Sequence, residues 1–156
     1  MLNVSRQNRT IEPILEILDS LAKSCFMPIS LGGGIKSVSD AKRLINFGAD
    51  KVVVNSSSYS NPSLIFDIAS ELGSQAVIAS IDCGKSNGVW HCLSNLGSDT
   101  EETDLENHLL RLVNAKVGEI LVQSVDRDGT MLGLDLQLLK FVTERVSVPV
   151  IGASGV

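Results

Sequence analysis

Segments with helical and with strand periodicity alternate along the whole chain. In five segments the apolar residues recur every three or four positions, which is the spacing of one face of a helix. Short continuous apolar runs lie between them, as in strands that are buried on both faces. The predicted helices span about 10–24, 37–48, 61–73, 103–116 and 135–146. The predicted strands span 28–31, 51–55, 75–82, 119–126 and 148–152.

Local signals define the ends of several elements. Ser37 followed by Asp40 three residues later predicts a capping box at the start of the second helix. Asn61 is the expected N-cap of the third helix, with Pro62 at the first helical position. The Asn87-Gly88 pair precedes an alternating run and predicts a β-hairpin.

The order of these elements predicts an α/β fold with parallel strands, because helices connect successive strands. With 156 residues, the chain is shorter than the roughly 200 residues of a complete (β/α)₈ barrel. We therefore expect an incomplete (β/α)₈ TIM barrel of about five of the eight strand–helix units, forming a single partial domain over residues 1–156. An open, doubly wound five-stranded sheet is the alternative interpretation.

Glycine-rich turns point to phosphate binding. The turn 32–34 lacks side chains, so a phosphate can approach backbone N–H groups near a helix N-terminus. Segment 28–35 also aligns with segment 149–156, which suggests two phosphate sites on one face of a repeating fold. Function in such folds lies at the carboxyl ends of the strands. The candidate residues predicted at those ends are Gly33, Gly34, Asn55, Ser56, Asp82, Asp128, Gly129, Thr130, Ser154 and Gly155.

Two of these groups offer specific chemistry. Asp82 is predicted to end an apolar strand, where burial favours a carboxyl that exchanges protons near neutral pH. The alternative is a helix cap or a surface turn residue. Gly129 can present its backbone N–H to an anion and Thr130 its hydroxyl, while Asp128 can hold a ribose. The alternative there is a simple Asp-Gly turn.

Other polar residues are expected away from this site. Lys51 and Glu119 begin strands at the opposite end of the sheet, where charges usually form stability pairs or partner contacts. His91 in the hairpin and His108 in a helix are expected to have surface roles. No histidine or cysteine pair has ligand spacing, so the sequence predicts no metal site.

Charge and composition exclude several classes of partner. The net charge of −5 and the pI of about 4.9 argue against a broad nucleic-acid surface, but not against a small phosphorylated ligand. No apolar run approaches the roughly 20 residues that span a membrane. The N-terminus is polar and the three cysteines form no CxxC pair, so we expect a reduced, cytoplasmic protein.

Several motifs in this order resemble the cyclase subunit of imidazole glycerol phosphate synthase. Individually these motifs are common, but their order and spacing are specific, and the resemblance covers almost the whole chain. The segments that carry it are 31–35, 48–52, 54–56, 61–62, 73–75, 80–82, 118–121 and 126–130.

The resemblance implies a (β/α)₈ barrel and a lyase of histidine biosynthesis that needs no cofactor. Such a cyclase uses ammonia from a glutaminase partner to convert a phosphoribulosyl-formimino aminoimidazole carboxamide ribotide to imidazole glycerol phosphate. Asp82 matches one of two catalytic aspartates. The other matches are listed by role: Gly34, Asn55 and Ser56 for one phosphate, Asp128, Gly129 and Gly155 for the other, and Lys51 and Glu119 for the ammonia entrance.

Departures from the family pattern leave alternatives open. The second catalytic aspartate ends the family's first strand; the first, second and eighth strands have no counterpart here. We therefore expect a chain truncated at both ends that is inactive alone. Ala153 replaces a usual Ser and Leu134 a usual Tyr, whereas 129–131 resembles paralogues that supply ammonia in surface-polysaccharide pathways. A related sugar-phosphate isomerase and a non-catalytic phosphate-binding or partner-binding remnant are further alternatives.

Overall fold

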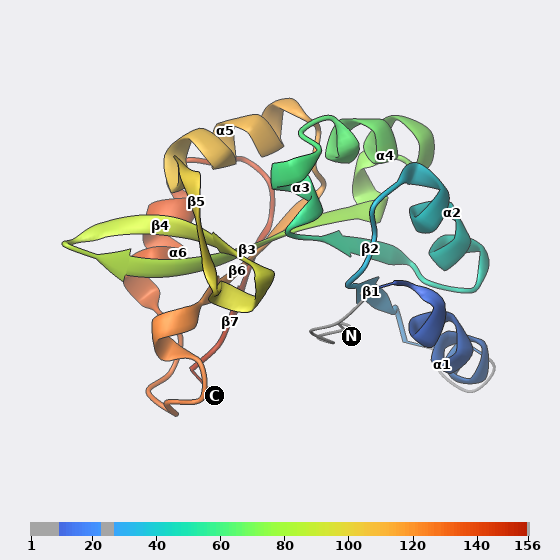
Figure 1. Cartoon of the computed structure of the whole chain (residues 1–156), viewed down its shortest axis with the longest axis horizontal. Coiled ribbons are helices and arrows are strands. Elements are labelled where there is room, and N and C mark those ends of the chain that lie inside the picture. The colour runs from blue at the N-terminus through green and yellow to red at the C-terminus, as the bar shows by residue number, and fades with distance from the viewer. Residues whose placement is uncertain (1–9, 23–26, 156) are drawn as a thin grey trace.

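Five parallel strands form the wall of a partial barrel in the computed structural model, which describes residues 10–22 and 27–155 (Figure 1). Each strand pairs with the strands that precede and follow it in this series, so their spatial order is their chain order. A doubly wound sheet would reverse its strand order at a switch point. The barrel prediction is confirmed, and the sheet forms a half-barrel. The strands are β1 (Ser30–Gly32), β2 (Lys51–Val54), β3 (Val77–Ser86), β6 (Glu119–Ser124) and β7 (Val150–Ala153).

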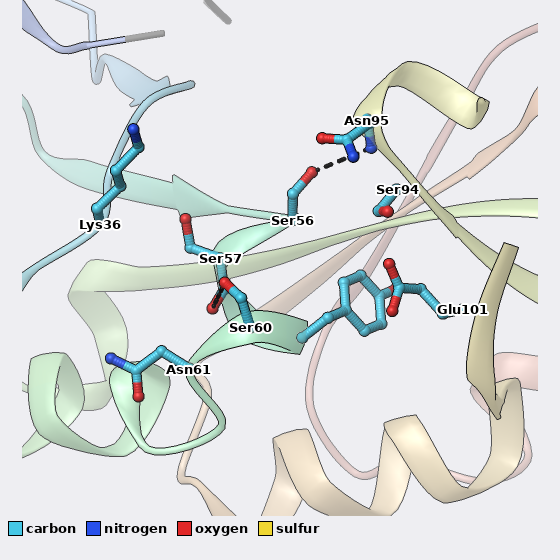
Figure 2. Close-up of a pocket in the computed structure, with 9 residues that line it drawn as sticks. Lys36, Ser56, Ser57, Ser60, Asn61, Ser94, Asn95 and Glu101 are labelled. Carbon is cyan, nitrogen blue, oxygen red and sulfur yellow. Dashed lines mark hydrogen bonds between the residues drawn. The ribbon is translucent and has the colours of Figure 1, made fainter. Parts of the chain in front are cut away.

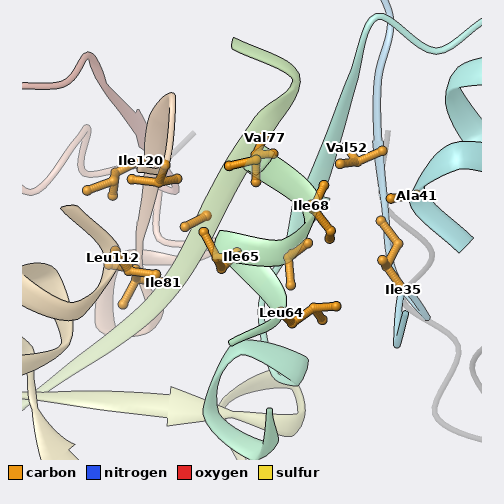
Figure 3. Close-up of a cluster of buried hydrophobic side chains, with 14 of the residues drawn as sticks. Ile35, Ala41, Val52, Leu64, Ile65, Ile68, Val77, Ile81, Leu112 and Ile120 are labelled. Carbon is orange, nitrogen blue, oxygen red and sulfur yellow. The ribbon is translucent and has the colours of Figure 1, made fainter. Parts of the chain in front are cut away.

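Helices connect these strands and cover one face of the sheet. Figure 3 shows strand residues such as Val52 and Ile120 gathered with Ile65 and Ile68 of α4 and Leu112 of α5 in one apolar core. Because side chains alternate along a strand, the neighbouring residues face the side that is the interior of a barrel. The helices are α1 (Glu12–Ala22), α2 (Val38–Asn46), α3 (Ser57–Ser60), α4 (Leu64–Leu72), α5 (Leu105–Asn114) and α6 (Leu136–Thr143).

An antiparallel arm extends the sheet beyond the end of β2. β3 pairs with β2 through residues 77–79 and with β4 (Val89–Ser94) through residues 82–86. Asn87 (φ 52°) and Gly88 (φ 81°) connect β3 to β4, so the predicted hairpin is confirmed. β5 (Asp99–Asp104) then pairs with β4 and was not predicted. Its polar residues show no apolar alternation, and its pairing with β4 makes it a strand.

Helix caps explain where the observed and predicted helices differ. The predicted capping box is present: Asp40 N–H donates to Ser37 Oγ (3.2 Å) and Ser37 N–H to Asp40 Oδ2 (3.0 Å). The prediction that Asn61 caps a helix over 61–73 is wrong. Asn61 instead lies at the C-cap position of α3, directly after its last residue, Ser60. The helix within this segment is α4, which has Ser63 at its N-cap position, and Asn61 Oδ1 accepts from Ser63 Oγ. The predicted end of the first helix, near residue 24, lies outside the described residues.

Candidate functional site

The predicted site residues follow or lie within the five parallel strands, toward the carboxyl ends. Because neighbouring parallel strands end at the same edge, the fold brings these groups to one end of the sheet. Gly33 and Gly34 follow β1, Asn55 and Ser56 follow β2, Asp82 lies in β3, residues 128–130 follow β6, and Ser154 and Gly155 follow β7.

The turn after β1 requires glycine. Gly33 and Gly34 have φ values of 99° and 83°, which residues with a side chain rarely adopt. A Cβ on Gly34 would lie 2.8 Å from the carbonyl carbon of Thr10, which is closer than real Cβ contacts. The sequence prediction of a bare backbone turn therefore fits the geometry of this strand end.

A cavity of about 480 Å³ opens beside Ser56, between α3 and the β4–β5 arm (Figure 2). Ser56 Oγ accepts a hydrogen bond from the Asn95 backbone N–H (3.3 Å), and Ser57 Oγ donates to the Ile35 carbonyl (2.6 Å). These bonds join the β1 turn, α3 and the arm around one polar cavity. Its lining comprises Lys36, Ser56, Ser57, Tyr59, Ser60, Asn61, Ser94, Asn95 and Glu101.

Asn55, which precedes this cavity wall, has one unpaired polar atom. Its side-chain Oδ1 is buried and has no hydrogen-bond partner among the described residues. Its backbone carbonyl accepts from both the N–H and the hydroxyl of Ser58 (2.8 and 2.7 Å). The backbone at Asn55 is thus fixed, while the amide oxygen remains available to a donor.

Asp82 is a buried carboxylate within β3, with 8% of its surface exposed. It pairs in register with Leu93 of β4 and Gln123 of β6. The expectation that Asp82 ends its strand is wrong, because pairing with β4 extends β3 to Ser86. The register places Asp82 on the same face as Gln123, opposite the apolar core beneath the helices.

The end of β7 is tied to the end of β6 and its loop. Ser154 Oγ accepts from the Ser124 N–H (3.0 Å), although Ser154 has a φ of 81°. The Gly155 carbonyl accepts from the Gly133 N–H (2.8 Å), and a Cβ on Gly155 would lie 2.1 Å from the Gly133 carbonyl oxygen. Ser154 and Gly155 therefore anchor the loop that carries the next candidate group.

The tip of the β6 loop is exposed. Gly129 has a φ of 68° and open space where a Cβ would lie. The Thr130 hydroxyl, expected to donate to a phosphate, donates to the Arg127 carbonyl (2.8 Å). Asp128 is also exposed. The tip can thus offer a backbone N–H and a carboxylate, while Thr130 stabilises the turn.

Lys51 and Glu119 lie at the opposite end of the sheet, where β2 and β6 begin. Their side chains form a salt bridge and are 30% and 21% exposed. The strand registers place β3 between them, so the pair connects strands that are not neighbours.

His108 is buried, so the expectation of a surface role for this residue is wrong. Its side chain is 2% exposed and stacks on Tyr59, with ring centroids 4.3 Å apart. Burial lowers the pKa of His108 to about 4. A signal was available, because His108 shares the helical spacing of Leu105, Leu109 and Leu112.

Among the described residues, no three His, Cys, Asp or Glu side chains are grouped to hold a metal ion. None of the described helices is long and apolar enough to cross a membrane.

Comparison with known proteins points to the same family as the motifs at the strand ends. A family model described as "Histidine biosynthesis protein" matches residues 2–156. The chain belongs to this histidine biosynthesis family. It is 39% identical to the imidazole glycerol phosphate synthase subunit HisF of Streptococcus sanguinis (strain SK36), over 99% of this chain and 62% of that protein.

Two further HisF subunits have a comparable sequence identity to this chain. The HisF subunit of Exiguobacterium sibiricum is 40% identical over 100% of this chain and 63% of its own length. That of Legionella pneumophila is 42% identical over 90% of this chain and 66% of its own length. The resemblance to the cyclase subunit is thus confirmed, and the chain spans a little under two thirds of the length of these relatives.

Proposed function

We propose that this chain is the part of an imidazole glycerol phosphate synthase cyclase that contains one acid/base aspartate and two phosphate-binding strand ends. The observation that carries the proposal is the position of Asp82. It is a buried carboxylate on β3, in the middle of a sheet whose outer strands, β1 and β7, are followed by glycine-bearing turns. The HisF relatives are named as subunits of the synthase that this proposal invokes.

The two turns suit the two ends of a diphosphorylated substrate. Gly33 and Gly34 follow β1, and Asn55 and Ser56 follow its neighbour β2. Together these strand ends offer backbone groups and short polar side chains, which bind phosphate without a net positive charge. Gly129, Ser154 and Gly155 are proposed to hold the second phosphate, with Asp128 at the adjoining ribose and Thr130 stabilising the turn through the Arg127 carbonyl. A substrate bound by both ends would cross the face that presents Asp82.

Asp82 is proposed as the general acid/base. In the proposed reaction ammonia adds to the formimino ribotide, the imidazole ring closes and an aminoimidazole carboxamide ribotide leaves. Asp82 would transfer protons during these steps, because its carboxyl lies on the face of the sheet that the substrate would cross. Asp82 is the single buried acidic side chain among the described residues, so its partner carboxylate would come from a longer protein.

The glutaminase partner is proposed to dock at the end of the sheet that carries Lys51 and Glu119. Ammonia would enter there and pass through the completed barrel to Asp82. Soluble phosphorylated substrates also suit the proposed cytoplasmic location.

A second candidate is a phosphate-binding or partner-binding protein without cyclase activity, including an ammonia-supplying paralogue for sugar amidation. The single buried acidic side chain favours this alternative, because the proposed chemistry uses two. The test is ammonia-dependent loss of the formimino ribotide's absorbance, with the chain alone and with the missing strands supplied as a second polypeptide. Turnover only after completion supports the cyclase. Phosphate-ligand binding without turnover supports the second candidate.

A further inference from the structure

The cavity beside Ser56 carries opposite charges on opposite walls. Figure 2 shows Lys36 at one side and Glu101 at the other, with the hydroxyls of Ser56 and Ser57 between them. None of the salt bridges found among the described residues includes either charged group. Both charges are therefore available to a ligand that enters from solvent.

The walls between these charges are rich in hydrogen-bonding groups. Ser60 and Asn61 line the cavity from the α3 side, and Ser94 and Asn95 line it from the arm. Polar groups of this kind fix the orientation of small ligands in pockets. A hydroxylated ligand would satisfy them better than an apolar one, because an unpaired polar group is costly to desolvate.

We propose that this cavity binds a polyhydroxylated phosphate that also carries a cationic amine, as an amino-sugar phosphate does. The phosphate lies at the Lys36 and Ser56 side, and the ammonium pairs with the Glu101 carboxylate. This inference rests on the proposed function, because it uses the phosphate-binding strand end next to Ser56. It adds a determinant on β5, a strand contributed by the antiparallel arm and not by the barrel wall.

Position along β5 identifies Glu101 as the selecting group. Glu101 is half-buried and lines the cavity, whereas Glu102 is exposed and absent from the lining. Successive side chains of a strand point to opposite faces. Glu102 is therefore a matched control with the same charge and nearly the same place in the chain.

The experiment compares glucosamine 6-phosphate with glucose 6-phosphate by calorimetric titration of the full 156-residue chain. The two probes differ only in an ammonium or a hydroxyl at one ring carbon. We expect glucosamine 6-phosphate to bind about fivefold more tightly, the ratio that one partly exposed ion pair produces. Glu101→Gln should abolish this preference, Glu102→Gln should retain it, and Lys36→Met should weaken the binding of both probes.

Each other outcome has a distinct meaning. Equal binding of the two sugars, or loss of the preference in Glu102→Gln, overturns the role of Glu101 but leaves the phosphate site intact. Failure of both sugars to bind a chain that circular dichroism shows to be folded overturns this inference and the proposed phosphate site together.

Discussion

Lys51 and Glu119 form a salt bridge between two strands that do not pair with each other. Lys51 begins β2 and Glu119 begins β6, and both strands pair with β3. The side chains retain 30% and 21% exposure, so solvent screens the pair only in part. The contact links residues 68 positions apart in the sequence.

Glu119→Gln should lower the free energy of unfolding by about 1 kcal/mol, because it leaves the Lys51 ammonium half-buried without its partner. Urea unfolding measures this change. The matched control is Glu71→Gln, which breaks the more exposed Lys42–Glu71 pair and should cost less than about 0.5 kcal/mol. Equal costs for the two variants would show that Lys51 and Glu119 contribute no more than a surface pair.

Gly155→Ala should destabilise the chain far more than Gly129→Ala. Both glycines have positive φ values, so both variants carry a backbone strain of about 1 kcal/mol. Only at Gly155 would the new Cβ also strike the Gly133 carbonyl, at 2.1 Å, whereas Gly129 has open space. We expect a loss of at least about 3 kcal/mol for Gly155→Ala in urea unfolding. A difference between the variants below 1 kcal/mol would contradict the close approach of the two segments.

Stability should decline as the pH falls through the range set by His108. Burial lowers its folded-state pKa to about 4 from the ordinary value of 6.5, so the unfolded chain binds the proton more readily. This contribution is fully present above pH 6.5 and is lost progressively toward pH 4. Between pH 7 and pH 5 it amounts to about 2 kcal/mol.

His108→Phe should remove this part of the pH dependence while keeping an aromatic ring against Tyr59. The measurement is urea unfolding of both proteins at pH 7 and pH 5, with His91→Phe as the control at the other histidine of the chain. An unchanged difference between the two pH values in His108→Phe would assign the acid sensitivity to carboxyl groups instead.

Asp82→Asn should abolish ammonia-dependent turnover in a completed barrel, since the amide cannot exchange the proton that the proposed mechanism needs. The side chain keeps its size, so the far-ultraviolet circular dichroism spectrum should not change. Absorbance of the formimino ribotide measures the turnover. Near-normal turnover of the variant would exclude Asp82 as the acid/base.

Much of the fold could be predicted because its signals are local. The Ser37–Asp40 capping box and the Asn87-Gly88 turn are each made by residues within three positions of one another, and both are present. The glycines at the strand ends were found for the same reason. Residues 99–104 were missed as a strand because their pairing with β4, and not their own pattern, makes them one.

In the candidate site, too, features with a local sequence signal could be predicted, whereas features that depend on contacts between distant segments could not. Asp82 could be selected from its strand, but the extension of that strand depends on β4. The burial of His108 depends on α5 packing and on Tyr59, from a distant helix. Glu101 gave no local signal, since a carboxylate in a polar run is usually a solvated surface group.

By itself, the sequence determined the alternation of helices and strands, the glycine turns and the family, because periodicity and motif spacing lie along the chain. Only the tertiary structure decided that Lys51 meets Glu119 and that Lys36 and Glu101 share one cavity. These relationships depend on which strands lie side by side and in which register. Pairing and packing between distant segments set that order, and no single segment encodes it.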